Sequence, residues 1–222
     1  PAMVLLNAIE FDHADIYRDL EHVKQAFRKL LALLAPGAPL VACGDFPEVL
    51  AVAAGTPARL LRFGVGADNP WRVTDLRDDG RVRFVVRHEG RAEAEVALRV
   101  PGAINARNAL GVMLIAAECG VPLATSAAAL ERFRGVQRRQ EVVAEARGVT
   151  VIDDFAHHPT AVEKTLAAAA ASFPGARLLT CFEPRSNTSR RNLHQSRYAR
   201  VWGRAAEVFL LLVAFRALGG QF

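Results

Sequence analysis

The sequence predicts an α/β protein built from two domains, with a parallel sheet in the second. At both ends of the chain, apolar runs of strand length alternate with patterns of helical period, as in parallel sheets with crossover helices. Between residues 59 and 100, short β-type runs are separated by the turn sequences DDG and HEG, which predict antiparallel hairpins. Helical sequence follows, and we expect the domain boundary near residue 135.

The first domain is expected to open with a strand, a long helix and a second strand. Within residues 15–34, apolar side chains recur at alternating steps of four and three, which places them on one helical face. Asp15 is expected to cap this helix, and Pro36 with Gly37 to end it. The expected elements are a strand at 4–9, a helix at 15–34, a strand at 40–43, β-type runs between 59 and 100, and helices at 105–120 and 122–133.

The second domain shows strand–helix–strand alternation. This order predicts a parallel sheet with right-handed crossovers. Thr160 and Glu163 stand at the spacing of a capping box at the start of a helix. The expected elements are a strand at 149–153, a helix at 160–172, a strand at 177–182, a helical region up to 206 and a strand at 208–212.

Composition places the chain among globular proteins. Of 222 residues, 51% are hydrophobic and 23% charged, enough to build a core. Cys43, Cys119 and Cys181 lie far apart without a CxxC pair, so we expect reduced thiols in a cytoplasmic protein and no zinc site. The apolar run at 208–215 is too short to cross a bilayer, so no membrane insertion is expected.

Charge is distributed unevenly along the chain. The net charge is +5, with −2 on residues 1–131 and +7 on residues 132–222. The basic half favours an anionic partner, although an Arg-rich solvated surface explains it equally well. Because the basic residues are not interleaved with aromatic ones, we expect no nucleic-acid partner.

Polar side chains follow two strands of the predicted parallel sheet, at the edge where ligands of such sheets bind. The stretch DDFAHHPT (153–160) follows the first strand, and EPRSN (183–187) follows the next. We expect these two clusters to converge, because the carboxyl ends of parallel strands share one edge. Neither has the Gly/Ser/Asn composition of an idle turn, so a binding or catalytic site is favoured over solvated loops.

Another acidic cluster, Glu10, Asp12, His13 and Asp15, follows the first strand of the chain. These side chains could bind a divalent cation. Helix capping is an equally good explanation for Asp15, and a lone histidine such as His13 is more often structural.

Two further pairs are expected near the interdomain cleft. Arg138 and Arg139 could reach a phosphate bound there, or could lie exposed on a linker. Asn105 and Asn108 stand at a helix start, where capping is the simpler explanation. A cleft lined by arginines, carboxylates and imidazoles favours an enzyme that acts on a phosphorylated ligand.

Taken together, five stretches resemble motifs of the Mur ligase family of bacterial cell-wall enzymes. They are NAIEFDHADIY (7–17), GAINARNAL (102–110), GVQRRQEVV (135–143), VIDDFAHHPTAV (151–162) and FEPRSNTSR (182–190). The resemblance implies that residues 1–134 are the rear part of the family's P-loop-type central (ATPase) domain. It implies that residues 135–222 are most of the Rossmann-like C-terminal domain, which binds the amine substrate.

The resemblance implies a cytoplasmic, ATP- and Mg²⁺-dependent amide ligase of peptidoglycan synthesis. DDFAHHPTA and EPRSNT look like the murein-recycling branch, which joins UDP-N-acetylmuramate to L-alanyl-γ-D-glutamyl-meso-diaminopimelate through an acyl phosphate. The alternative is the branch that adds L-alanine, which typically shows YGHHPTE. Two alternatives of other classes are a metal-dependent hydrolase and a non-catalytic interaction fragment.

The resemblance also implies roles for single residues. His13 would bind the second magnesium, Arg139 would reach the ATP phosphates, and His157 would line the amine-substrate site. These three are the expected catalytic residues. The remaining assignments are Asn105 and Asn108 toward the adenine, Asp154 toward the ribose, and Arg185, Ser186 and Asn187 toward the amine substrate.

Two departures from the family pattern matter. Ile104 stands where the family has a histidine before Asn105. In addition, no GxxGKT-type phosphate loop occurs in these 222 residues, although the family carries one upstream of the NAIEFDH segment. We therefore expect a fragment that by itself neither binds ATP productively nor turns over.

Overall fold

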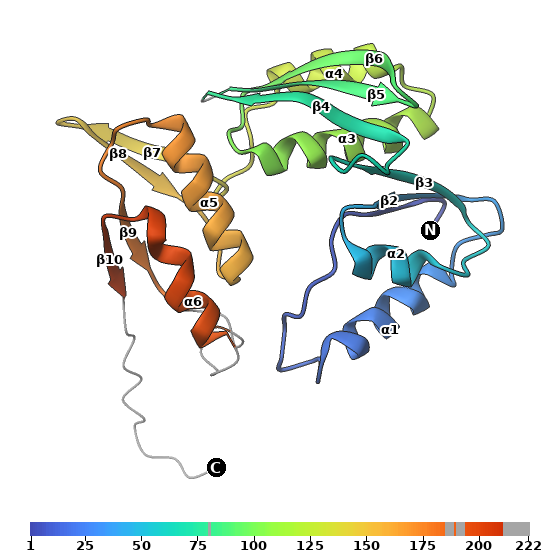
Figure 1. Cartoon of the computed structure of the whole chain (residues 1–222), viewed down its shortest axis with the longest axis horizontal. Helices are drawn as coiled ribbons and strands as arrows, with labels where there is room; N and C mark the ends of the chain where they lie inside the picture. The colour runs from blue at the N-terminus through green and yellow to red at the C-terminus, as the bar shows by residue number, and fades with distance from the viewer. Residues whose placement is uncertain (80, 185–188, 190–193, 211–222) are drawn as a thin grey trace, which may run out of the picture.

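The computed structural model describes residues 1–79, 81–184, 189 and 194–210. Residues 1–134, below called the N-terminal part, form one sheet with its helices, whereas the described strands of residues 135–222, the C-terminal part, form two smaller sheets. Figure 1 shows the two parts side by side, with α5 (Pro159–Ser172) on the side of the C-terminal part that faces the N-terminal part. The fold is α/β with parallel strands, as the sequence predicts.

One six-stranded sheet organises the N-terminal part, with its strands in sequence order. Strands β1 to β4 pair in parallel, and β4, β5 and β6 pair antiparallel, which confirms the predicted hairpins. The elements are β1 Val4–Leu6, α1 Leu20–Leu31, β2 Pro39–Cys43, α2 Pro47–Ala53, β3 Arg59–Gly64, β4 Trp71–Asp78, β5 Val82–His88, β6 Arg91–Leu98, α3 Ala103–Glu118 and α4 Leu123–Arg132.

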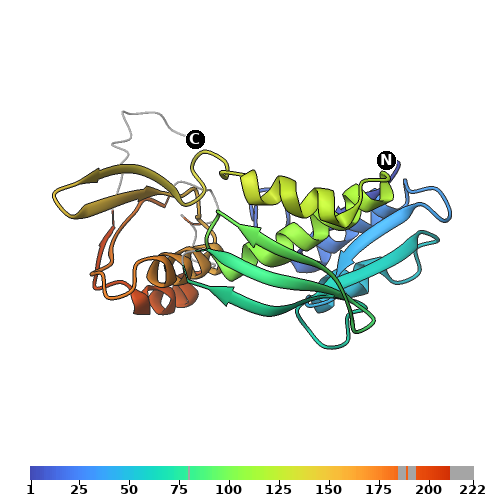
Figure 2. The ribbon, with the colours of Figure 1, turned by 90° about the horizontal axis from the view of Figure 1, so that it is seen from above.

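Helices cover both faces of the parallel strands. Alternate side chains of a strand point to opposite faces, so Leu40 and Ala42 of β2 pack with α1 and α2, whereas Val41 and Cys43 pack with α3. Because β2 is buried on both faces, its sequence PLVAC carries no charged residue. Helices α3 and α4 lie together on one side of β4–β6 (Figure 2).

The first helix begins later than expected. It starts at Leu20 with Asp19 as its N-cap, so the prediction that Asp15 caps it was wrong. A separate turn comes first, because the carbonyl of His13 accepts hydrogen bonds from two following backbone N–H groups. Ile16, expected on the apolar face, is 64% exposed in this turn.

The C-terminal part contains a strand that the sequence did not reveal. Strand β7 pairs antiparallel with β8, and β9 pairs in parallel with β10 through the crossover that contains α6. Within the described residues no ladder joins β8 to β9, so the expected single parallel sheet is not formed there. The side chains of β7 are mostly exposed, so its sequence lacks the alternation that marks a strand. The elements are β7 Glu141–Ala146, β8 Val149–Asp153, α5 Pro159–Ser172, β9 Leu179–Phe182, α6 Gln195–Val201, a 3₁₀ turn Trp202–Arg204 and β10 Glu207–Leu210.

Helix α5 begins without the expected capping box. Pro159 takes the first helical position, where its missing N–H is no loss, and His158 is the N-cap. The side chain of Thr160 does not cap the helix, because it donates its hydrogen bond to Glu10 of the N-terminal part. None of the described helices has the length and apolarity that a membrane span requires.

Candidate functional site

The loop after β1 meets the start of α5 at the junction of the two parts. Glu10 Oε2 accepts a hydrogen bond of 2.7 Å from Thr160 Oγ1 and lies 3.5 Å from His158 Nδ1. The guanidinium of Arg197, on α6, donates to Thr160 Oγ1 at 2.7 Å and lies 3.9 Å from the same carboxylate oxygen. Residues far apart in the sequence therefore form one polar cluster.

His157 lies beside this cluster, in contact with the loop that follows β1. Its Nε2 is 3.6 Å from Asp12 Oδ2, and its Nδ1 is 3.1 Å from the carbonyl oxygen of Phe155. The hydroxyl of Tyr198 donates a hydrogen bond to the backbone carbonyl of His157. The ring of His157 thus contacts Asp12 and Phe155, and its backbone carbonyl is bound by Tyr198.

His158 and His194 form the buried side of the cluster. Their rings meet edge to face, with centroids 5.0 Å apart, and the side chain of His158 is 11% exposed. Burial lowers the pKa of His158, and the carboxylates of Glu10 and Asp12 oppose part of that shift. The net lowering favours the neutral imidazole, so its contact with Glu10 at neutral pH is a contact of a neutral ring.

His13 does not sit in a cluster of metal ligands. Its side chain is exposed, its φ is 53°, and its N–H donates to Asp12 Oδ1 at 2.7 Å. Across the described part of the chain, no group of three or more His, Cys, Asp or Glu side chains is placed to hold a metal ion. The expectation of a cation at Glu10, Asp12, His13 and Asp15 therefore gains no support from ligand geometry.

Arg138 and Arg139 lie against the loop that follows β8. Both guanidinium groups lie over the ring of Phe155, at 5.1 and 5.7 Å from its centroid. Arg138 Nε is also 3.4 Å from Asp153 Oδ2. Both arginines are exposed, and the aromatic ring gives each of them a partner.

Asp154 connects the segment around Gln140 with the loop that follows β8. Its carboxylate accepts hydrogen bonds from the N–H of Gln140 at 2.9 Å and from the N–H of Ala156 at 2.7 Å. Gln140 has φ +50°, a conformation that non-glycine residues rarely adopt without such support. The carboxylate is therefore held in place by the backbone.

Asn105 and Asn108 form a chain of side-chain hydrogen bonds from the end of β1 to the start of α3. Asn105 donates to the carbonyl of Pro101 at 2.6 Å, Asn108 donates to Asn105 at 3.2 Å, and Asn7 donates to Asn108. Gly102 is the N-cap of α3, so the capping explanation for these asparagines was wrong.

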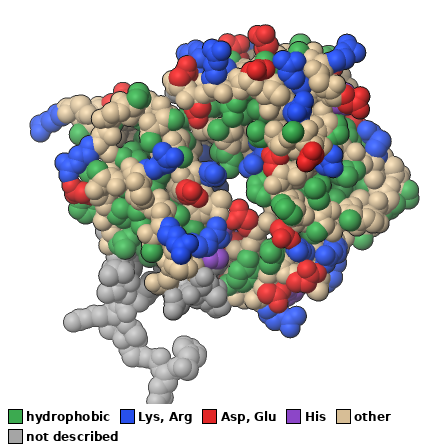
Figure 3. Space-filling model, viewed as in Figure 1, with side chains coloured by type: hydrophobic (Ala, Val, Ile, Leu, Met, Phe, Trp, Pro, Cys, Tyr) green, Lys and Arg blue, Asp and Glu red, His purple; other side chains and the backbone are tan. Residues whose placement is uncertain are grey.

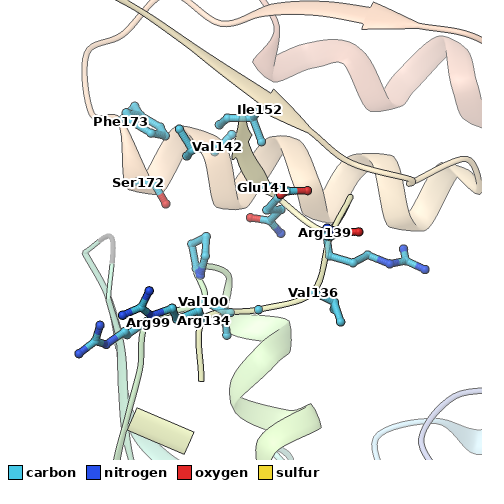
Figure 4. A pocket seen from close by; sticks show the side chains of 15 residues that line it. Arg99, Val100, Arg134, Val136, Arg139, Glu141, Val142, Ile152, Ser172 and Phe173 are labelled. Atoms are coloured by element: carbon cyan, nitrogen blue, oxygen red, sulfur yellow. The ribbon is translucent and has the colours of Figure 1, made fainter. Parts of the chain in front are cut away.

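A pocket of about 550 Å³ opens between the two parts beside the linker. Figure 4 shows Val142, Ile152 and Phe173 together on one wall and Arg99 with Arg134 near the opposite wall. The side chain of Arg139 lines the rim and extends away from the apolar wall.

We expected the loops that follow β8 and β9 to meet, and of these two only the loop after β8 is described in full. Arg185, Ser186 and Asn187 lie outside the described residues. What the structure brings to the 157–160 stretch is the loop at 10–12 together with α6. In Figure 3, basic side chains of the C-terminal part lie near acidic ones across the junction, with a histidine next to them.

Sequence reasoning missed four residues of this cluster: Thr160 as a contact between the parts, His194, Arg197 and Tyr198. The sequence signal at Thr160 was the spacing of a capping box, which indicated a local role and not a contact between the parts. The other three belong to a short helical region without a recognisable pattern.

Two sequence profiles match the chain. That of the Mur ligase middle domain matches residues 1–116, and that of the Mur ligase glutamate ligase domain matches residues 138–218. With this α/β fold and this order of motifs, the chain belongs to the Mur ligase family.

Its relatives include ligases of two kinds. The chain is 36% identical over 215 residues, 95% of its length, to the UDP-N-acetylmuramate–L-alanyl-γ-D-glutamyl-meso-2,6-diaminoheptandioate ligase of Haemophilus influenzae, of which it covers 46%. It is 34% identical over 185 residues, 83% of its length, to the UDP-N-acetylmuramate–L-alanine ligase of a Geobacter species, of which it covers 40%. The chain thus spans less than half the length of these relatives.

The fold is shared with solved structures. The UDP-N-acetylmuramate-alanine ligase of Thermotoga maritima aligns with a TM-score of 0.76 at 24% identity, over 95% of this chain and 45% of that one. At this identity the likeness concerns the fold alone.

Proposed function

We propose that the protein to which this chain belongs is an ATP-dependent amide ligase of murein recycling. It joins the carboxylate of UDP-N-acetylmuramate to the amine of L-alanyl-γ-D-glutamyl-meso-diaminopimelate, through an acyl phosphate, with release of ADP and phosphate. The observation that carries the proposal is the meeting of residues 10–12 with residues 157–160 at the junction. Membership of the Mur ligase family supports it.

The tripeptide is proposed as the amine substrate. Identity alone does not choose, since relatives of both kinds match at 36% and 34%. The residues Phe155-Ala156 and the sequence SNT at 186–188 support the tripeptide ligase. The second candidate is the L-alanine-adding reaction, which the name of the Geobacter relative supports.

The nucleotide is proposed to bind at the junction. Asp154 would hold the ribose: its carboxylate is oriented by two backbone N–H groups, and each of its oxygens retains a lone pair for a hydroxyl. Arg139 would bind the phosphates, for which a guanidinium is well suited. Asn105 and Asn108 would face the adenine with the donor and acceptor capacity that their hydrogen bonds to each other, to Pro101 and to Asn7 leave.

Magnesium is proposed to bind near His13. Mg²⁺ is usually bound by one or two carboxylates and completes its shell with waters and substrate phosphates, so His13 would act together with the neighbouring carboxylate of Asp12. When bound, the ion supplies charge neutralisation for the transferred phosphoryl group.

The amine substrate is proposed to bind beside His157, with Arg185, Ser186 and Asn187 on the same site. The contacts of His157 with Asp12 and Tyr198 orient it before any substrate arrives. Acyl transfer from a phosphate depends mostly on such positioning and on charge stabilisation.

A further proposal concerns the extent of this chain. We place the domain boundary between residues 134 and 135, which the ranges of the two profiles support. Because these residues contain no GxxGKT loop, the 222-residue chain alone is proposed to be inactive. Calorimetric titration with Mg-ATP tests this, and micromolar binding by the chain alone would overturn it.

The ligase proposal is tested on the full-length protein. With UDP-N-acetylmuramate and ATP, we expect amide formation with the tripeptide, and little with free L-alanine. His157→Ala should raise the KM for the tripeptide more than the KM for ATP, whereas Glu163→Gln, on the exposed side of α5, should change neither. A clear preference for free L-alanine would exclude the recycling reaction.

A further inference from the structure

The segment that enters β7 contains a turn in which two residues other than glycine adopt a left-handed backbone. Arg138 has φ +58° and Gln140 has φ +50°, and Arg139 lies between them. For each such residue this conformation is about tenfold less populated than an ordinary one, because the Cβ crowds the following carbonyl oxygen. The turn therefore persists only because other contacts of the folded chain hold it.

Hydrogen bonds from two sides hold this turn. From the loop that follows β8, the N–H of Phe155 donates to the carbonyl of Arg138 at 2.8 Å, and Asp154 Oδ2 accepts from the N–H of Gln140 at 2.9 Å. From the other side, Oε2 of Glu141, the first residue of β7, accepts from the N–H of Arg138 at 2.8 Å. Glu141 thus holds one of the two left-handed residues, and Asp154 holds the other.

The turn also decides where the side chain of Arg139 lies. In an extended strand, consecutive side chains point to opposite sides. Here the guanidinium groups of Arg138 and Arg139 both lie over the ring of Phe155, at 5.1 and 5.7 Å from its centroid, because the backbone turns at Arg138. Since Arg139 is the residue proposed to bind the ATP phosphates, the conformation of this turn sets the position of a nucleotide-binding group.

We propose that Glu141 is a positioning residue for the nucleotide, an inference that rests on the proposed function. Its carboxylate keeps Arg138 left-handed and so orients Arg139 before ATP arrives. The apparent affinity for a ligand falls in proportion to the population of the binding-competent conformation. Loss of the Glu141 carboxylate should therefore weaken ATP binding by about three- to tenfold. Saturating ATP selects the competent turn, so kcat should stay close to that of the wild type.

Steady-state kinetics of the full-length protein test this inference, with UDP-N-acetylmuramate, the tripeptide and ATP as substrates. Glu141→Ala should raise the KM for ATP by about three- to tenfold, and should change kcat and the KM for the tripeptide by less than about twofold. Glu141→Gln retains an oxygen that can accept the hydrogen bond, so it should behave as the wild type. Glu145→Ala removes an exposed carboxylate from the same strand and is the matched control.

A change at position 138 separates this positioning role from a general effect on stability. Glycine adopts the left-handed conformation without penalty, so in an Arg138→Gly background Glu141→Ala should change the KM for ATP by less than about twofold. Arg138→Asn provides a second background, because asparagine tolerates this conformation and is less flexible than glycine. An equal effect of Glu141→Ala in every background, or no effect in the wild type, would overturn the inference.

Hydrogen exchange of the 222-residue chain, followed by NMR, tests the contact without any substrate. The N–H of Arg138 is bound to a carboxylate, so it should exchange about tenfold more slowly in the wild type and in Glu145→Ala than in Glu141→Ala. Equal rates in the three proteins would contradict the inference. If the full-length wild type forms no amide, the ligase proposal fails, whereas the exchange rates still decide whether Glu141 holds the turn.

Discussion

The carboxylate of Asp45 provides the sharpest test of how the N-terminal part is held together. Asp45 follows β2, and its oxygens accept hydrogen bonds from the N–H of Val65 at 2.8 Å, from the N–H of Gly66 at 2.9 Å and from Asn69 Nδ2 at 3.0 Å. These three donors belong to the loop between β3 and β4. Asp45→Asn replaces one accepting oxygen with an NH₂ group that faces a donor, so at least one bond is lost.

The cost of this change follows from the contacts. A hydrogen bond to a charged group contributes about 1.5–3 kcal/mol, and Asp45 makes three of them while its side chain is only 15% exposed. Val65 and Gly66 are exposed, so water replaces part of what is lost. We therefore expect Asp45→Asn to lower the free energy of unfolding by about 2–4 kcal/mol. For a chain of this size that lowers Tm by about 4–16 °C.

Urea unfolding followed by tryptophan fluorescence in a Trp202→Phe background measures this change, because Trp71, the tryptophan that remains, opens the strand directly after the loop. Asp79→Asn is the matched control: its carboxylate is 66% exposed and pairs with Arg83 on the surface, so a change below about 0.5 kcal/mol is expected. If Asp45→Asn is as stable as this control, the loop is not held by the carboxylate.

Two further predictions concern thiol and phenol groups. Burial raises the pKa of Cys43 to about 11, so a thiol reagent at pH 8 should modify Cys119 and Cys181 in the folded protein and leave Cys43 unmodified; three modified thiols would contradict this. Burial also raises the pKa of Tyr198 from 10.0 to about 12, so the stability that its neutral hydroxyl provides is complete below pH 10 and is lost as the pH rises to about 12. The wild type should be more stable than Tyr198→Phe by about 1 kcal/mol at neutral pH, and this difference should vanish over that pH range. A difference that does not depend on pH would show that the neutral hydroxyl of Tyr198 is not its source.

The glycines around Asp45 show how a tertiary contact explains a residue choice. The spacing Gly64–Gly66 does not fit a dinucleotide fingerprint, and β4, not a helix, follows it. The structure gives the reason for the glycine: a Cβ on Gly64 would lie 2.2 Å from Asp45 Oδ1. The backbone at Gly64 thus packs directly against the carboxylate of Asp45, and this contact leaves no room for a side chain.

Local patterns determined the elements with strong periodicity. The buried strand β2, the β4–β6 hairpins and the helices α3 and α4 follow from apolar runs and turn residues within a few positions of each other. The order of motifs was also sufficient to indicate the Mur ligase family, because such motifs are read along the chain.

Tertiary structure decided what depends on contacts between distant residues. Thr160 has the spacing of a cap, yet its hydroxyl bonds to Glu10, 150 residues away. Strand β7 is held by its pairing with β8 and not by an apolar pattern of its own. A side chain chooses among local and distant partners by free energy, and the distant partner exists only once the chain has folded. For this reason the sequence by itself determined the class of the fold and the family, and only the folded chain showed which side chains meet at the junction.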